Sequence, residues 1–170
     1  IESTVLPPFL GSTLRGAIGQ ALHQDIDAFN YLYSNRLTKD NRQDTVNPYV
    51  IIPPEIDEKP YRTGEELHFR MLLFGDAAQY VQSVVNALSL LKDTGLGALR
   101  HRFLLFKVLH GSDDRIIWQN GVFYPEAAQS VALLWWTLPD VRQAALYIRT
   151  PLRIRRNGVL LDKVDFSTVV

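Results

Sequence analysis

The stretch LHFRMLLFGDAAQYVQSVVNALSLLKDTG, residues 67–95, decides the fold, because its hydrophobic period changes from two residues to a helical one. The first part predicts a strand over residues 67–74, in which Leu67, Phe69, Met71 and Leu73 alternate with His68, Arg70, Leu72 and Phe74. The second part predicts a helix with Asp76 as its N-cap and an end at Asp93-Thr94-Gly95. Its apolar stripe consists of Ala77, Val81, Val84, Leu88 and Leu91.

A second helix and a second strand precede this stretch. Residues 13–23 predict a helix capped by Ser12 or Thr13, with an apolar face formed by Leu14, Ile18, Ala21 and Leu22. Gly16 and Gly19 each weaken such a helix by about 1 kcal/mol. Two glycines at this spacing indicate that another backbone, from the sheet or from a ligand, comes close. Residues 25–47 predict mostly loop, and Pro48–Pro54 predicts a strand bounded by prolines.

These elements follow one another in the order of a ferredoxin-like fold. The apolar segment Ile1–Phe9 is consistent with the end of a strand, and a further strand is expected at Phe103–Leu109. The order strand–helix–strand–strand–helix–strand is that of the split βαβ motif. We therefore expect an α+β fold with a four-stranded antiparallel sheet and two helices on one face.

The remainder of the chain contains further strand signals. Asn120-Gly121 between Arg115–Gln119 and Val122–Tyr124 predicts a hairpin. Val131–Leu138 is apolar and contains two tryptophans, which we expect in the core or in a contact between domains. Ala144–Ile154 predicts a strand that is interrupted at Pro151, and Asn157-Gly158 predicts a turn.

Composition excludes several classes of protein. With 170 residues, of which 46% are hydrophobic, the chain can bury an ordinary core and is not wholly disordered. The absence of cysteine excludes a disulfide scaffold, an iron–sulfur cluster and a thiolate zinc site. No apolar run approaches the ~20 residues of a membrane span. We expect a cytoplasmic protein that needs no metal, no cofactor and no membrane.

The charges are balanced in number, at 18 positive and 18 negative, but they are unevenly distributed along the chain. Two windows, residues 95–110 and 141–158, contain basic side chains and no carboxylate. Acidic residues concentrate between Glu55 and Glu66. Arginine beside glycine-rich turns suits a phosphate backbone, although a solvated strand face would have the same composition.

Five short motifs follow one another along the chain: Gly11-x-x-Leu14-Arg15-Gly16-Ala17-Ile18-Gly19, Pro48-Tyr49-Val50-Ile51-x-Pro53-Pro54, Leu72-x-Phe74-Gly75, Gly95-Leu96-Gly97-x-x-Arg100-x-Arg102-Phe103 and Thr150-Pro151-Leu152-Arg153. In this order they resemble the CRISPR-associated RAMP proteins, in particular the endoribonuclease that cuts CRISPR precursor RNA at its repeats. Each motif alone is weak, but five in the right order are more specific, and the resemblance runs across about residues 9–156.

The resemblance implies tandem ferredoxin-like domains that bind CRISPR repeat RNA. Residues 1–140 would form an N-terminal RAMP domain, and residues 141–170 would be the first strands of a second domain, incomplete here. Many relatives carry a cysteine cluster after the first helix, whereas this chain has none. The implied reaction is metal-independent: the ribose 2′-hydroxyl attacks the adjacent phosphorus and leaves a 2′,3′-cyclic phosphate.

The reaction needs a base, an acid and a cation for the developing charge. Histidine, with a reference pKa near 6.5, suits the first two roles. Members of the family often have a catalytic histidine near the first helix, so His23 and Tyr31 are the catalytic candidates. A surface histidine at a helix C-terminus, and a half-buried aromatic strip formed by Phe29, Tyr31 and Tyr33, are the structural alternatives.

The candidate RNA-binding residues come from the first helix and the two basic windows, and they are Arg15, Gly95, Gly97, Arg100, His101, Arg102, Arg153 and Arg155. Arg15 could instead pair with a carboxylate such as Asp25, and Gly95 could be a plain helix C-cap. Two alternatives to the nuclease remain open. One is a non-catalytic RNA-binding RAMP subunit that associates with other CRISPR effector subunits, and the other is a ferredoxin-like protein-interaction domain.

Overall fold

The computed structural model describes residues 4–7, 9–34, 47–54, 60–132, 155–156 and 159–161. The chain divides into two units, residues 1–37 with 47–130, and residues 38–46 with 131–170. The first unit contains β1 (Thr4–Val5), α1 (Gly11–Leu22), α2 (Ile26–Phe29), the π-helical η1 (Asn30–Ser34), β2 (Tyr49–Ile52), β3 (Pro60–Tyr61) and β4 (Arg70–Leu73). It continues with the 3₁₀ segment η2 (Gly75–Tyr80), α3 (Val81–Ser89), α4 (Leu91–Thr94), β5 (Lys107–Leu109), β6 (Ile116–Gln119), β7 (Val122–Phe123) and η3 (Pro125–Ala128).

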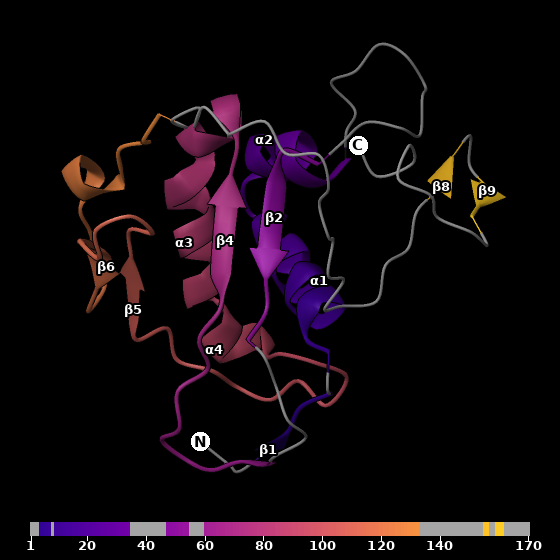
Figure 1. Ribbon diagram of the computed structural model, residues 1–170. Helices are drawn as coiled ribbons and strands as arrows, with labels where there is room; N and C mark the ends of the chain where they lie inside the picture. The colour runs from indigo at the N-terminus through magenta and orange to yellow at the C-terminus, as the bar shows by residue number, and fades with distance from the viewer. Residues whose placement is uncertain are drawn as a thin grey trace, which may run out of the picture. The chain divides into compact units, whose positions relative to one another are not determined.

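The centre of this unit is the antiparallel pair β2–β4, with α1 and α3 packed behind it (Figure 1). Tyr49 pairs with Leu73 and Ile52 with Arg70. The inner face of β4 and the segment before it consists of the predicted alternating residues: Leu67, Phe69, Met71 and Leu73 are half-buried, while His68, Arg70, Leu72 and Phe74 are exposed. The alternation predicted over residues 67–74 is confirmed, but only Arg70–Leu73 of the predicted strand is in a ladder.

The main core lies between this strand pair and the helices. It contains Ile18 and Leu22 from α1, Leu32 from η1, and Val84 and Leu88 from α3. The predicted apolar faces of both helices are therefore the faces that are buried. A neighbouring cluster joins Leu6, Leu10 and Leu14 to Tyr61 and Leu96, which fastens the start of α1 to the segment after α4.

The expected combination of helices with antiparallel strands is confirmed. Within the described residues, the strands form three pairs, β1–β3, β2–β4 and β8–β9, and one three-stranded sheet, β5–β6–β7. Of the predicted strand Phe103–Leu109, only Lys107–Leu109 is in a ladder, and its partner is β6. The hairpin at Asn120-Gly121 is confirmed, since both residues adopt the positive φ that a two-residue connection requires, 50° and 83°.

The two predicted caps are wrong. Helix α1 begins at Gly11 with Leu10 as its N-cap, so Ser12 and Thr13 lie inside the first turn and cap nothing. Asp76 lies in the first turn of η2 and makes no capping hydrogen bond. In both cases the helical segment begins one or two residues before the polar side chain, which therefore does not occupy the N-cap position.

The prediction of loop over residues 25–47 is wrong for residues 26–34, which form α2 and η1. Asp25 is the N-cap of α2: its Oδ1 accepts a hydrogen bond from the amide of Ala28 at 3.1 Å. The polar character of this segment concealed a capping signal, because aspartate at this position favours a helix start as much as a turn. Residues 35–46 lie outside the described part of the chain.

Asp25 also joins α2 to α3, because its Oδ2 accepts a hydrogen bond from Oγ of Ser83 at 2.6 Å. Two hydrogen bonds hold the pKa of Asp25 below its usual value: the one from Ser83 has the larger effect, and the one from the Ala28 amide comes next. A carboxyl with a lowered pKa stabilises the fold above its ordinary pKa, and this contribution is lost as the pH falls through the folded-state value.

We expect Asp25→Ala to lower the free energy of unfolding at neutral pH by about 1–2 kcal/mol, through loss of the cap and of the Ser83 bond. The difference between wild type and variant should shrink below about pH 4, as the wild-type carboxyl becomes protonated. Urea unfolding of both proteins across that pH range measures the effect. Asp76→Ala is the matched control, since Asp76 is exposed and caps no helix. An equal loss in both variants would contradict the capping role.

The second unit is described only at β8 (Arg155–Arg156), β9 (Val159–Leu160) and Leu161. The two strands are antiparallel, with Arg155 opposite Leu160 and Arg156 opposite Val159. They flank the predicted turn Asn157-Gly158, which itself lies outside the described residues. The predicted strand at Ala144–Ile154 and most of the apolar segment Val131–Leu138 lie outside them too.

Candidate nucleic-acid interface

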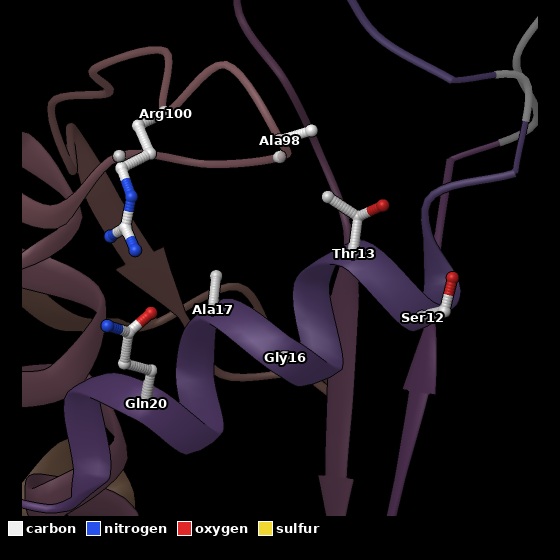
Figure 2. A pocket seen from close by; sticks show the side chains of 9 residues that line it. Ser12, Thr13, Gly16, Ala17, Gln20, Ala98 and Arg100 are labelled. Carbon is white, nitrogen blue, oxygen red and sulfur yellow. The ribbon is translucent and has the colours of Figure 1, made fainter.

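A hollow of about 470 Å³ lies between α1 and the turn that follows α4, and we call it the α1 hollow. It is lined by Ser12, Thr13, Gly16, Ala17, Gln20, Gly95, Gly97, Ala98 and Arg100. Figure 2 shows α1 as its floor, with the side chains of Thr13, Ala17 and Gln20 rising toward the turn opposite. Three of the predicted RNA-binding residues, Gly95, Gly97 and Arg100, are thus brought together with a helix that lies about 80 residues earlier in the sequence.

The turn is shaped by glycines and by one strained arginine. Leu96 and His101 form an isolated antiparallel bridge, in which the Leu96 amide donates to the His101 carbonyl at 2.7 Å and the His101 amide donates back at 3.0 Å. To close so tightly, Gly95, Gly97 and Arg100 adopt φ angles of 74°, 77° and 51°. The side chain of Leu96 is buried in the cluster with Leu14, which anchors the turn over α1.

The residues on the open face of α1 recur at helical spacing. Gly16 and Gln20 lie one turn apart, and His23, the C-cap residue, continues the same face. A Cβ atom placed on Gly16 would meet no atom within 4 Å. At Gly19, by contrast, it would overlap the ring of Tyr33. The close approach predicted from the two glycines is therefore made at Gly19 by an aromatic ring, whereas Gly16 faces open space.

The polar groups around the α1 hollow are free to bind a ligand. Arg100 is exposed, and the only hydrogen bond that its side chain makes with the described residues is a long one, 3.4 Å from Nη1 to the Thr94 carbonyl. The hydroxyls of Ser12 and Thr13 and the amide of Gln20 make no hydrogen bond with the described part of the chain. No carboxylate is among the residues that line the hollow. Its charge therefore comes from Arg100.

Arg15 lies on a different side of α1 from the hollow. Its Nε donates a hydrogen bond to the hydroxyl of Tyr49 on β2 at 3.1 Å, rather than pairing with Asp25. The ring of Tyr49 stacks on Tyr33 with centroids 5.0 Å apart. Burial raises the pKa of the Tyr33 hydroxyl well above its usual value. In this position Arg15 joins the helix to the sheet.

The two catalytic candidates, His23 and Tyr31, make ring contacts with different residues. His23 is exposed at the end of α1, and its ring centroid is 3.8 Å from that of Phe29. Tyr31 is half-buried and packs against Tyr80, 5.1 Å away between centroids. No contact between described residues joins His23 to Tyr31. The predicted half-buried aromatic strip is confirmed in part: Phe29, Tyr31 and Tyr33 are all half-buried, and the ring of Phe29 stacks on that of Tyr33 with centroids 5.9 Å apart. The segment is helical rather than extended, and Tyr31 packs elsewhere.

The other predicted RNA-binding residues are distributed differently. The Nε2 atom of His101 is buried and has no hydrogen-bond partner among the described residues. Arg102 is exposed just after the turn. Arg155 lies on β8 in the second unit, and Arg153 lies outside the described residues. The sequence indicated Gly16 as a place where a ligand could come close, but Thr13 and Gln20 were missed as parts of the same surface. Their small or polar character at helical spacing, opposite the apolar face, was the available signal.

A second polar cluster surrounds His110, to which sequence reasoning assigned no role. Its Nδ1 lies 3.0 Å from Oδ1 of Asp113, and its Nε2 lies 3.1 Å from the carbonyl of Gln129. Asp113 also pairs with Arg115 at 2.8 Å, and this arginine holds the pKa of Asp113 below its usual value. The cluster ties the loop between β5 and β6 to the segment after η3.

Among the described residues, no three histidine or acidic side chains gather as the ligands of a metal ion. No helix in the same part of the chain has the length and apolar character that crossing a membrane requires.

Comparison with known proteins identifies the family of the chain. Residues 1–131 match the model of the family AF_1859_N, described as an N-terminal domain. A protein of Archaeoglobus fulgidus named "Uncharacterized protein" is 29% identical over 144 residues, which are 75% of this chain and 49% of that protein. The chain thus spans about half the length of the curated relative it matches. No solved structure matches. Because the family model covers more than half of the chain, this protein belongs to the AF_1859_N family of N-terminal domains.

Proposed function

We propose that this domain binds RNA through the α1 hollow, as part of a RAMP-type endoribonuclease that processes CRISPR repeat RNA. The observation that carries the proposal is the hollow itself, which combines an open glycine on α1, an exposed Arg100 and a lining free of carboxylates. RNA-binding surfaces need positive charge and close backbone approach, and acidic side chains would repel the phosphates. The motif resemblance points to the same ligand.

The arrangement of α1, β2, β4 and α3 supports the ferredoxin-like part of the proposal. In such a fold, two antiparallel strands at the middle of the chain are flanked by two helices on one face of the sheet. The β2–β4 pair and the two helices packed on it have this arrangement. We propose that β1 and the segment from Phe103 correspond to the two remaining strands.

The proposed reaction is cleavage by the ribose 2′-hydroxyl. The hydroxyl loses its proton to a base, its oxygen bonds to phosphorus, and the 5′-oxygen leaves with a proton from an acid. The products are a 2′,3′-cyclic phosphate and a 5′-hydroxyl. His23 lies one helical turn beyond Gln20 on the hollow's face of α1, so a strand held in the hollow would pass close to its imidazole. This position supports His23 as the proton-transfer group.

We expect repeat RNA to bind the chain with an affinity that falls steeply as salt rises. Arg100→Ala should weaken binding of every RNA sequence by about five-fold or more and reduce the slope of log K against log salt by about 0.7, one phosphate contact. Fluorescence anisotropy over a series of salt concentrations measures both values. Arg70→Ala is the matched control, because Arg70 is also exposed but lies on the outer face of β4.

An equal loss in the two variants would show that the RNA binds elsewhere. No binding at low salt would favour the alternative of a protein-interaction domain.

A second candidate is a non-catalytic RNA-binding RAMP subunit that works with other CRISPR effector subunits. The ring contacts favour it, since Arg15 is held by Tyr49, and His23 and Tyr31 face different partners. RNA binding by the full-length protein without any cleavage would select that candidate.

A further inference from the structure

We propose that the α1 hollow holds one unpaired RNA nucleotide, with Gln20 recognising the edge of its base and Arg100 contacting its phosphate. This inference rests on the proposed function and names the part of the RNA that the hollow accepts. It makes Gln20 a specificity-determining residue, a role that the sequence motifs do not indicate.

The first argument concerns the kinds of hydrogen-bonding group around the hollow. A phosphate offers acceptors, so a site for phosphate alone needs donors. The hollow instead presents the amide of Gln20 and the hydroxyls of Ser12 and Thr13, each of which is both donor and acceptor. A ligand with donors and acceptors of its own can pair with both kinds of group, and a nucleobase edge is such a ligand.

The second argument concerns the position of the two planar side chains. Figure 2 shows the Arg100 guanidinium, which comes from the turn, and the Gln20 amide, which comes from α1, pointing toward one another across the hollow. Neither side chain is paired with the other, and the amide of Gln20 has no partner in the described part of the chain. A ligand between them would therefore meet a charged donor on one side and an amide on the other.

The third argument concerns size and shape. A volume of about 470 Å³ lies within the range of small-ligand sites and suits one nucleotide. Gly16 leaves the floor free of side chain, so that a ring or a ribose can lie directly on α1. Because Arg100 is the one cation in the lining, the hollow neutralises one phosphate, whereas a duplex site spans several. An unpaired nucleotide fits these constraints.

The test compares binding of short RNAs of about eight nucleotides, with A, C or U at all positions, to the wild type and to three variants. The wild type should discriminate between the bases by about five-fold or more in dissociation constant, and Gln20→Ala should remove most of that discrimination. Arg100→Ala should weaken all three RNAs equally and keep their order. Gln24→Ala is the matched control, because Gln24 is exposed near the end of α1 but lies outside the hollow.

A fourth variant, Gly16→Leu, fills the floor of the hollow at a position where a Cβ atom has open space around it. Leucine is a better helix former than glycine and would meet no protein atom near its Cβ, so the thermal midpoint should stay the same or rise. RNA affinity should nevertheless fall by about ten-fold or more, as expected for steric loss of one bound nucleotide. Unchanged affinity in Gly16→Leu would overturn the inference, because the hollow would then not be occupied.

The outcomes separate the inference from the proposed function. If RNA binds and Arg100→Ala weakens it, but base discrimination is the same in wild type and Gln20→Ala, the base-edge role is wrong and RNA binding stands. If a duplex competes as well as single strands of the same length, the unpaired-nucleotide inference is wrong. If no RNA binds, both the proposed function and the inference fail.

Discussion

Replacing Gly95 by alanine is expected to destabilise the protein by about 3 kcal/mol and to abolish RNA binding at the α1 hollow. Gly95 has φ 74° and ψ 172°, a backbone conformation that is essentially restricted to glycine. A Cβ atom there would also overlap the carbonyl of Arg100, which is backbone and cannot rotate away. Relief of that overlap would open the bridge between Leu96 and His101 and displace Arg100 from the hollow.

Two other glycines provide a graded comparison. Gly97 also has positive φ, but its Cβ would make only an ordinary contact with Thr13, at 3.8 Å, so Gly97→Ala should cost about 1–2 kcal/mol. Gly111 has nothing within 4 Å, and Gly111→Ala should have little effect. Urea unfolding and RNA anisotropy on all three variants measure the series. A Gly95→Ala variant as stable as Gly111→Ala would show that the turn does not depend on this conformation.

The turn also illustrates how much of the site could be predicted from the sequence. Two glycines followed by arginines indicate a turn suited to phosphate, and Gly95, Gly97 and Arg100 do line the hollow. The sequence does not reveal that Leu96 buries its side chain beside Leu14 and so places the turn over α1. That contact joins segments about 80 residues apart, and local hydrophobic patterns contain no information on it.

The fold was most predictable where a long amphipathic pattern is decisive. The strand and the helix within residues 67–95 and the Asn-Gly hairpin have strong local signals. The structure has all three, although the strand is limited to Arg70–Leu73 and the predicted single helix is divided into η2, α3 and α4. The segment after α1 has no such stripe, and its helical turns depend on Asp25, which contacts both Ala28 and Ser83. A capping residue that also accepts a hydrogen bond from a helix far along the chain is a tertiary feature. The local hydrophobic pattern contains no sign of it and therefore predicted a loop.

His23→Ala is expected to reduce cleavage of repeat RNA by the full-length protein, measured with EDTA present, by about 10²–10⁴-fold, the usual contribution of a proton-transfer group. RNA binding should remain within about two-fold of wild type, because the phosphate contact comes from Arg100 and a lone exposed imidazole adds little to affinity. The imidazole of His23 makes a tilted contact with the ring of Phe29, and His23 lies at the end of α1 on the face of the helix that continues from Gly16 and Gln20.

His68→Ala is the matched control for this variant, because His68 is 75% exposed, pairs with Glu66 at 3.1 Å and lies on the strand side of the molecule, in the segment before β4. Cleavage by His68→Ala should equal that of wild type, since that imidazole lies outside the lining of the hollow. Equal cleavage by wild type and His23→Ala would exclude His23 as the proton-transfer group. If the full-length wild type also binds repeat RNA and leaves it intact, a non-catalytic RNA-binding subunit becomes the better description of this protein. The hollow would then hold RNA with no general base in position to accept the proton of the 2′-hydroxyl.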